Sequence, residues 1–395
     1  MEAEKWIGVL ERWGYEVHRV AGFIPGAGVN DHIIPELNFR DPVIESFTTS
    51  AFSTRREEAE VERELGSLTG LIGEQLAPVL DGIAPDLMVV ENLFSLPVNM
   101  PLTLALCRYV EEREPPVAAV HHVFYWQSPA FSSYCVFDDL LVSHFPPSLP
   151  RVRHVTISQA SREELYQKTA VTSNCLYYCF DFDNVRGQDG FNAGLRRDLG
   201  VGESEAMFLQ PPCTIGKEGT KQSVKFTREF AAAAGRRSHL VVTGCGEGDR
   251  EKIDHLRRAA GVSVIHVPGW LGRKRDEPGM GFPYDIHDAY ARCDMVTFPS
   301  MKEGFGHPIM ESVLHKKPLL TSNYPLLEEL RGFGFQFLPM DRQAAARTVK
   351  LLDHPQLMDE MTGRNFEIGR RYFSLEALEE ELEGLLSGLI GSPVK

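Results

Sequence analysis

The sequence has 395 residues, of which 43% are hydrophobic and 24% charged, so it is long enough for two soluble domains of ordinary size. Its 41 basic and 55 acidic residues leave a net charge of −14, which argues against nucleic acid or an anionic membrane surface as a partner. The seven cysteines show no CxxC motif and no paired framework, which indicates a reducing, cytoplasmic location and no metal site. No targeting signal and no integral membrane segment is expected, since no uncharged apolar run reaches the ~18 residues that a spanning helix needs.

In the first half of the chain, helical and strand-like patterns alternate, which is typical of parallel sheets covered by helices. The expected helices span residues 2–13, 56–80 and 98–112. The expected strands span residues 15–21, 86–90 and 117–121. Turn-forming Asp, Asn and Gly residues over 180–200 then indicate a linker.

The second half repeats this alternation, which predicts a second domain of the same class. Its expected strands are 207–210, 239–243, 262–267, 295–298 and 318–321. Its expected helices are 221–234, 249–260, 285–292, 308–315 and, in the tail, 374–388.

The most informative segment is 299–311 (PSMKEGFGHPIME), which leaves a strand, passes two glycines and enters a helix near Pro308. The unpaired N–H groups at such a helix start, together with the helix dipole, favour an anion. Glu303 and Glu311 flank this point and could both face one cleft, where carboxylates hold hydroxyl groups by charge-assisted hydrogen bonds. This combination predicts a nucleotide-sugar site. A capped helix after a buried strand would explain Pro308 but not both glutamates.

The same residues carry a family resemblance. The run from Glu303 to Glu311 matches the E-x7-E signature (EGFGxPxxE) of the retaining nucleotide-sugar glycosyltransferases of the GT-B fold, and the chain resembles a bacterial branch of family 4. The resemblance implies an α/β protein with two doubly wound, Rossmann-like domains facing a central cleft. It also implies that Glu303 contacts the transferred sugar, that the backbone of Phe305 and Gly306 approaches its hydroxyls, and that Glu311 binds the ribose.

The resemblance extends to other positions. The residues expected at the donor are Lys217, Gly244, Gly246, Val267, Phe305, Gly306, His307, Pro308, Ile309 and Glu311. The expected catalytic residues are Glu303 and His121, because a histidine after this strand reaches the reacting sugar in the bacterial branch. His122 is the close alternative, and a histidine simply packed at a strand end remains an equal possibility for either residue.

The resemblance also implies the domain boundaries. Residues 1–182 would form the acceptor-side domain, which lacks the family's first strand. Residues 183–370 would form the nucleotide-sugar domain, and residues 371–395 a helix that packs back toward the first domain. An absent central strand would leave an edge that another chain could cover, so a homo-oligomer or a complex with another transferase is left open.

Two functions remain in competition. The first is a retaining transferase that moves a hexose from a UDP-, GDP- or ADP-sugar to a small-molecule or glycan acceptor, without a metal or other cofactor. The second arises because Cys213 and Glu218 stand where the family has an Arg and a Lys that clamp the diphosphate. Lys217 or Lys221 could substitute; otherwise the chain would be a degenerate GT-B protein, acting as a noncatalytic partner or in altered chemistry.

Overall fold

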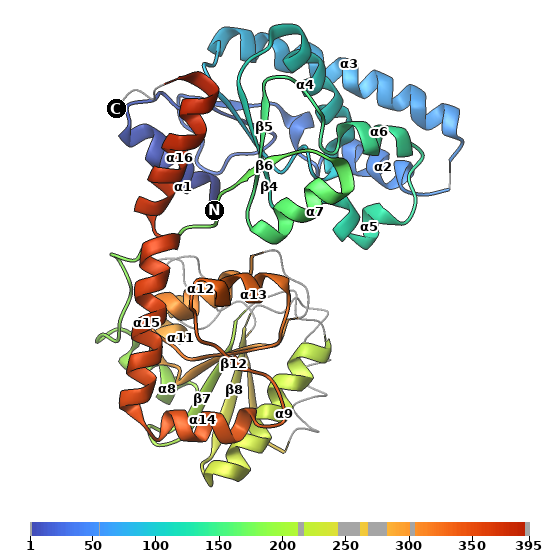
Figure 1. Cartoon of the computed structure of the whole chain (residues 1–395). Helices are drawn as coiled ribbons and strands as arrows, with labels where there is room; N and C mark the ends of the chain where they lie inside the picture. Colours follow the sequence, from blue (N-terminus) through green and yellow to red (C-terminus); the bar gives the residue numbers. More distant parts are fainter. Residues whose placement is uncertain are drawn as a thin grey trace. The chain divides into compact units, whose positions relative to one another are not determined.

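The computed structural model describes residues 2–54, 56–211, 217–243, 261–267, 283–300 and 305–391, without the side chains of Lys217 and Glu218. The chain divides into two compact units, which are described separately (Figure 1). Unit 1 comprises Met1–Cys179 and Leu378–Lys395, and unit 2 comprises Phe180–Ala377. The sequence predicted changes of domain at 182/183 and 370/371, a few residues from these positions.

Unit 1 contains parallel strands in two sheets among the described residues, ordered β1-β2 and β3-β4-β5-β6. The strands are β1 (Arg19–Ala21), β2 (Asp31–Ile33), β3 (Met88–Glu91), β4 (Val117–His121), β5 (Val152–Thr156) and β6 (Ser173–Cys175). The helices are α1 (Glu2–Arg12), α2 (Pro42–Ala51), α3 (Glu58–Ile83), α4 (Met100–Arg113), α5 (Pro129–Ser132), α6 (Asp138–His144) and α7 (Gln159–Thr169). No pairing joins the two sheets within the described residues.

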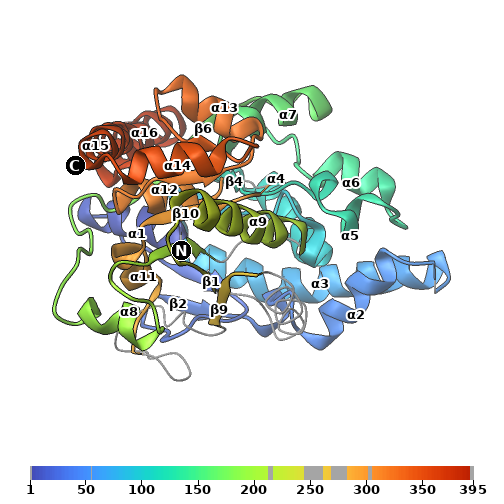
Figure 2. The same ribbon diagram turned by 90° about the horizontal axis from the view of Figure 1, so that it is seen from below.

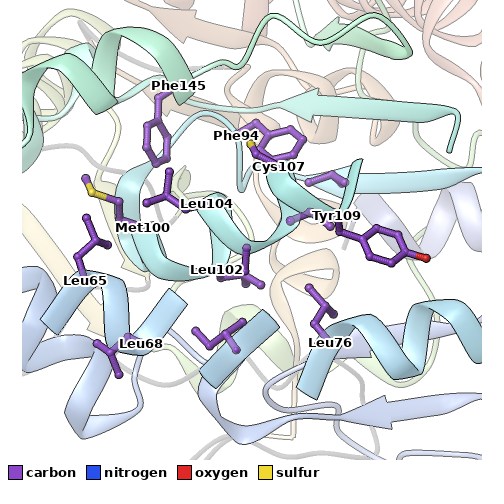
Figure 3. Packing of buried hydrophobic residues seen from close by; sticks show 14 of the residues in the cluster. Leu65, Leu68, Leu76, Phe94, Met100, Leu102, Leu104, Cys107, Tyr109 and Phe145 are labelled. Carbon is purple, nitrogen blue, oxygen red and sulfur yellow. The ribbon is translucent and has the colours of Figure 1, made fainter. Parts of the chain in front are cut away.

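The core of unit 1 lies between α3, α4 and the four-stranded sheet. Buried residues of α3 recur every three or four positions from Val61 to Leu80, which gives the helix one apolar stripe. That stripe faces α4, and Leu65 and Leu76 point toward α4 residues such as Leu102 in Figure 3. In Figure 2, α2 lies beside α3. This packing holds the carboxyl ends of β3 and β4 in fixed positions.

Unit 2 contains one parallel sheet among the described residues, with the order β12-β11-β10-β7-β8-β9. Its strands are β7 (Ala206–Gln210), β8 (Ser238–Thr243), β9 (Ser263–Val267), β10 (Met295–Phe298), β11 (Leu319–Thr321) and β12 (Leu338–Pro339). Because β7 pairs with both β8 and β10, the strand order reverses between β7 and β10, as in a doubly wound sheet. Ligands of such sheets bind beyond the carboxyl ends of the strands at this switch point.

Helices cover the sheet of unit 2. They are α8 (Leu195–Asp198), α9 (Lys217–Ala234), α11 (Ile286–Arg292), α12 (His307–Leu314), α13 (Pro325–Gly332), α14 (Ala344–Leu352), α15 (Pro355–Phe373) and the start of α16 (Leu375–Ile390). Helices α9 and α14 lie alongside one another in Figures 1 and 2 and enclose a core with Phe208, Phe226 and Phe230. The helices α9 and α12 follow β7 and β10, so both begin near the switch point.

Most predicted elements are present, with ends shifted by at most four residues. The strands predicted at 117–121 and 295–298 have the predicted bounds, whereas the strand predicted at 15–21 shortens to Arg19–Ala21. The helix predicted at 249–260 lies outside the described residues. No helix in the described ranges is both long enough and apolar enough to cross a bilayer.

Candidate active site

Helix α12 begins at a turn that only glycine fits. Gly306, its N-cap, has φ 74°, in the left-handed region that residues with a Cβ rarely adopt. A Cβ on Gly306 would also lie 2.9 Å from the hydroxyl oxygen of Tyr324 and 3.4 Å from Cε1 of Phe298. Pro308 stands in the first turn, where its missing N–H costs no hydrogen bond. The glycine and proline of the motif therefore set the entry of the chain into α12.

Phe305 anchors this turn from inside the unit. Its side chain is buried, and its ring centroid lies 6.4 Å from that of Phe180 and 6.0 Å from that of Phe373. Burial of the ring fixes the backbone of residues 305–306 without placing the side chain at the surface. Ile309 and Pro308 are also buried, whereas His307 is exposed and its ring contacts Phe180 edge-on. Of these motif positions, only His307 presents its side chain outward.

A hydrogen bond from a described residue holds the carboxylate of Glu311. Glu311 lies in the second turn of α12 and is half-buried. The Tyr290 hydroxyl, from α11, donates to Oε2 of Glu311 at 2.7 Å. Oε1 of Glu311 accepts no hydrogen bond from the residues that the structure describes, so it can accept from a ligand hydroxyl.

Two histidines lie next to Tyr290: His315 contacts its ring, and His287 contacts His315. The ring of His315 stacks on Tyr290 with centroids 5.2 Å apart and planes 7° apart, and its Nε2 lies 3.0 Å from Nδ1 of His287. Burial lowers the pKa of His315 to about 3, so its imidazole is neutral at neutral pH. The only negative charge in this group of four residues is the Glu311 carboxylate.

Several predicted donor residues cannot be placed. Glu303, Gly244 and Gly246 lie outside the described residues, as does Cys213. Lys217 is the first residue of α9, but the structure describes neither its side chain nor that of Glu218. Val267 ends β9, opposite Thr243 in the register of the pair, and its side chain is buried. A role of Val267 in binding the base would therefore fall to its backbone.

In unit 1, His121 lies inside a hydrogen-bonded chain at the end of β4. Its Nδ1 lies 2.6 Å from Oγ of Ser95, and its Nε2 lies 2.9 Å from Nδ1 of His154. His154 is itself buried, and burial lowers its pKa to about 4. Only 1% of His121 is exposed, and burial lowers its pKa well below the ordinary value. Both ring nitrogens of His121 are occupied, so in this structure its ring does not reach outward.

The next residue, His122, is more accessible, with 20% of its side chain exposed. Its Nε2 lies 2.6 Å from Oε2 of Glu91, at the end of β3, and its Nδ1 lies 2.6 Å from the hydroxyl oxygen of Tyr178. The Asn92 side chain accepts from the backbone N–H of His122 at 3.0 Å. These contacts gather His122, Glu91 and Tyr178 at the carboxyl edge of the four-stranded sheet, the edge where α/β proteins bind ligands.

No group of three or more His, Cys, Asp or Glu side chains is placed to hold an ion within the described part of the chain.

Comparison with known proteins identifies the fold and the class of enzyme. Residues 215–354 match the family model described as glycosyl transferases group 1. A mannosylglucosylglycerate synthase of Thermotoga maritima is 26% identical over 97% of this chain and 95% of its own. A glycosyltransferase structure from Rickettsia africae has a TM-score of 0.69 at 12% identity, covering 98% of this chain and 94% of that one. The Anabaena HepE complex with UDP-glucose has a TM-score of 0.58 at 16% identity, covering 82% of each chain.

The chain is a glycosyltransferase of the GT-B fold. The predicted fold class is thereby confirmed, and the family match includes the turn at Gly306 and helix α12. In this glycosyltransferase, sequence analysis missed the partners that hold the candidate residues: Tyr290, His154, Ser95, Glu91 and Tyr178. Helical spacing could have shown that Tyr290 is buried, but the sequence contains no signal that pairs it with a residue 21 positions away.

Proposed function

We propose that this glycosyltransferase moves a hexosyl group from a nucleoside diphosphate sugar to an acceptor hydroxyl with retention of configuration. The acceptor oxygen bonds to the anomeric carbon as the bond from that carbon to the diphosphate oxygen breaks. The acceptor proton passes to the departing diphosphate, so the products are a glycoside and a nucleoside diphosphate. Attack and departure on the same face of the sugar retain the configuration.

The position of Glu311 carries this proposal. Its carboxylate stands on the helix that follows β10, one of the two strands at the switch point, and one of its oxygens accepts no hydrogen bond from described residues. A half-buried carboxylate in that place is suited to two neighbouring hydroxyls, such as those of a ribose. In the proposal, Glu311 therefore binds the ribose, Glu303 the transferred sugar, and the start of α12 the developing phosphate charge.

We assign the sugar-facing role in unit 1 to His122 rather than to His121. His121 is enclosed between Ser95 and His154, whereas His122 is partly exposed beside Glu91. His121 then serves to hold the end of β4, from which His122 follows. We further propose that the enzyme needs no metal and works in a reducing, cytoplasmic environment, where the buried thiols of Cys107, Cys135, Cys179 and Cys293 stay reduced.

The test is a transfer assay with the full chain. UDP-, GDP- and ADP-linked glucose and mannose are offered, with glycerate, glucosylglycerate and simple glycosides as acceptors. Glucosylglycerate is included because the name of the Thermotoga relative contains it. We expect one donor to yield nucleoside diphosphate and a glycoside whose NMR coupling shows the donor's anomeric configuration. Inverted product would overturn the retaining mechanism, and absence of binding to UDP, GDP and ADP would overturn the donor class.

A further inference from the structure

We propose that Tyr290 is a positioning residue for nucleotide binding: its hydroxyl holds Oε2 of Glu311 so that Oε1 is directed to the ribose hydroxyls. This inference rests on the proposed function, in which Glu311 binds the ribose. The direct observation is the 2.7 Å hydrogen bond from the Tyr290 hydroxyl to Oε2 of Glu311. Tyr290 itself would touch neither sugar nor nucleotide.

The Tyr290 hydroxyl is a fixed donor. The residue is fully buried, and its ring lies flat against His315. The start of its helix, α11, is also braced: Asp285 and Asp288 form a reciprocal capping box, and Arg186 donates to the Asp285 carboxylate. A side chain enclosed in this way loses no further freedom when a ligand binds.

The hydrogen bond also gives the two carboxylate oxygens of Glu311 different roles. A glutamate on a helix surface has several rotamers, and fixing it at the moment of binding costs entropy. Since Oε2 is already bound to Tyr290, Glu311 is ordered before the ligand arrives. Both lone pairs of Oε1 then remain for the two ribose hydroxyls.

The surroundings of Tyr290 favour donation in this direction. His315 stacks on the tyrosine ring rather than meeting its hydroxyl, and burial keeps that imidazole neutral. Nδ1 of His287 forms a hydrogen bond with Nε2 of His315, so these two ring nitrogens are paired with each other. The Tyr290 hydroxyl donates to the Glu311 carboxylate, and a charged acceptor makes the stronger hydrogen bond.

The experiment compares Tyr290→Phe, Glu311→Gln and the double variant by calorimetry. The probe is whichever of UDP, GDP and ADP binds the wild type most tightly, together with its 2′-deoxy counterpart. We expect Tyr290→Phe to weaken binding of the ribonucleotide about tenfold and of the deoxynucleotide less than about threefold. The double variant should bind no more weakly than Glu311→Gln alone, because Tyr290 acts through Glu311.

Tyr284→Phe is the matched control. The Tyr284 hydroxyl also donates to a carboxylate in unit 2 at 2.7 Å, that of Asp198, and the residue is likewise buried. Its loss should leave nucleotide affinity unchanged, and thermal unfolding shows whether both variants remain folded.

Three results would overturn the inference. Equal weakening of both nucleotides by Tyr290→Phe would show a structural role only. Wild-type affinity in Tyr290→Phe, with selective loss in Glu311→Gln, would remove Tyr290 but leave the proposed function standing. A wild type that binds none of the three diphosphates would overturn the proposed function and this inference with it.

Discussion

Nε2 of His121 lies 2.9 Å from Nδ1 of His154 on the neighbouring strand β5. Two imidazoles at this distance cannot both carry a proton on the facing nitrogens, and the low exposure of both rings disfavours any charge. With the Ser95 hydroxyl on the other nitrogen of His121, the pair is a neutral, buried hydrogen-bonded chain at the edge of the sheet. His121, the last residue of β4, is thus enclosed, whereas His122, which follows the strand, is partly exposed.

We expect His122→Ala to lower kcat about a hundredfold with little change in thermal stability, because His122 is the partly exposed ring beside Glu91. His121→Asn should instead lower the melting temperature and leave kcat of the remaining folded enzyme near the wild type. Steady-state kinetics and thermal unfolding of both variants check this. Loss of kcat in a stable His121→Asn, with an active His122→Ala, would restore the sugar-facing role to His121.

Acid should destabilise both units through their buried histidines. Burial lowers the pKa of His154 to about 4 and of His315 to about 3, so the unfolded chain binds more protons between these values and about 6.5. Above about pH 6.5 both histidines are neutral in the folded and unfolded chain, so they add no pH dependence to stability there. As the pH falls below this value, each histidine lowers the unfolding free energy by about 1.4 kcal/mol per pH unit.

Urea unfolding at pH 7.5, 6.0 and 5.0 measures this loss. His154→Gln and His315→Gln should each have a shallower dependence of unfolding free energy on pH than the wild type. The exposed His354→Gln shows whether replacing any histidine has this effect. Slopes identical to the wild type in both buried variants would contradict the prediction.

Gly306→Ala should destabilise the chain by about 1–3 kcal/mol and reduce nucleotide affinity, because the new methyl group meets Tyr324 and the backbone is left-handed there. Gly363→Ala is the control: this glycine lies within α15 with no atom within 4 Å of an added Cβ. Helix propensity predicts that it stabilises by about 0.5–1 kcal/mol. Chemical unfolding and calorimetry measure both variants, and a Gly306→Ala chain as stable as the wild type would disprove the strain.

Phe305→Ala should cost about 3–5 kcal/mol of unfolding free energy, since it removes a buried ring between Phe180 and Phe373. Phe305→Leu should retain most of the stability and most of the affinity for nucleotide. The comparison separates anchoring from ligand contact, and both variants are assayed by unfolding and calorimetry. A stable Phe305→Leu that binds no nucleotide would show that the ring itself touches the ligand.

The fold could be predicted from the sequence because hydrophobic periodicity is a local pattern: it depends only on residues that are close together along the chain. The VAAVH run of β4 and the apolar stripe of α3 are local signals, and both elements formed where expected. Short elements with mixed patterns, such as β2 (Asp31–Ile33) and β5 (Val152–Thr156), were not predicted. These strands have only 3 and 5 residues, so their hydrophobic pattern cannot be distinguished from that of a loop.

The candidate site was predictable only in part. Gly306, Pro308 and Glu311 form a contiguous motif, and their placement at the start of α12 follows from local turn chemistry. The burial of His121 depends on His154, which stands on the unpredicted strand β5. The tether between Tyr290 and Glu311 likewise depends on how α11 and α12 meet, which no local pattern specifies.

Helix α16 gives the chain an order of assembly. Its first residues belong to unit 2, whereas Leu382, Leu385 and Leu386 are buried in unit 1 and Glu379 pairs with Arg12 of α1. A ribosome therefore releases the last part of unit 1 only after all of unit 2 has been made. During synthesis, unit 1 therefore cannot complete its packing until unit 2 has been made. Until then, the surface of unit 1 that these leucines cover stays exposed.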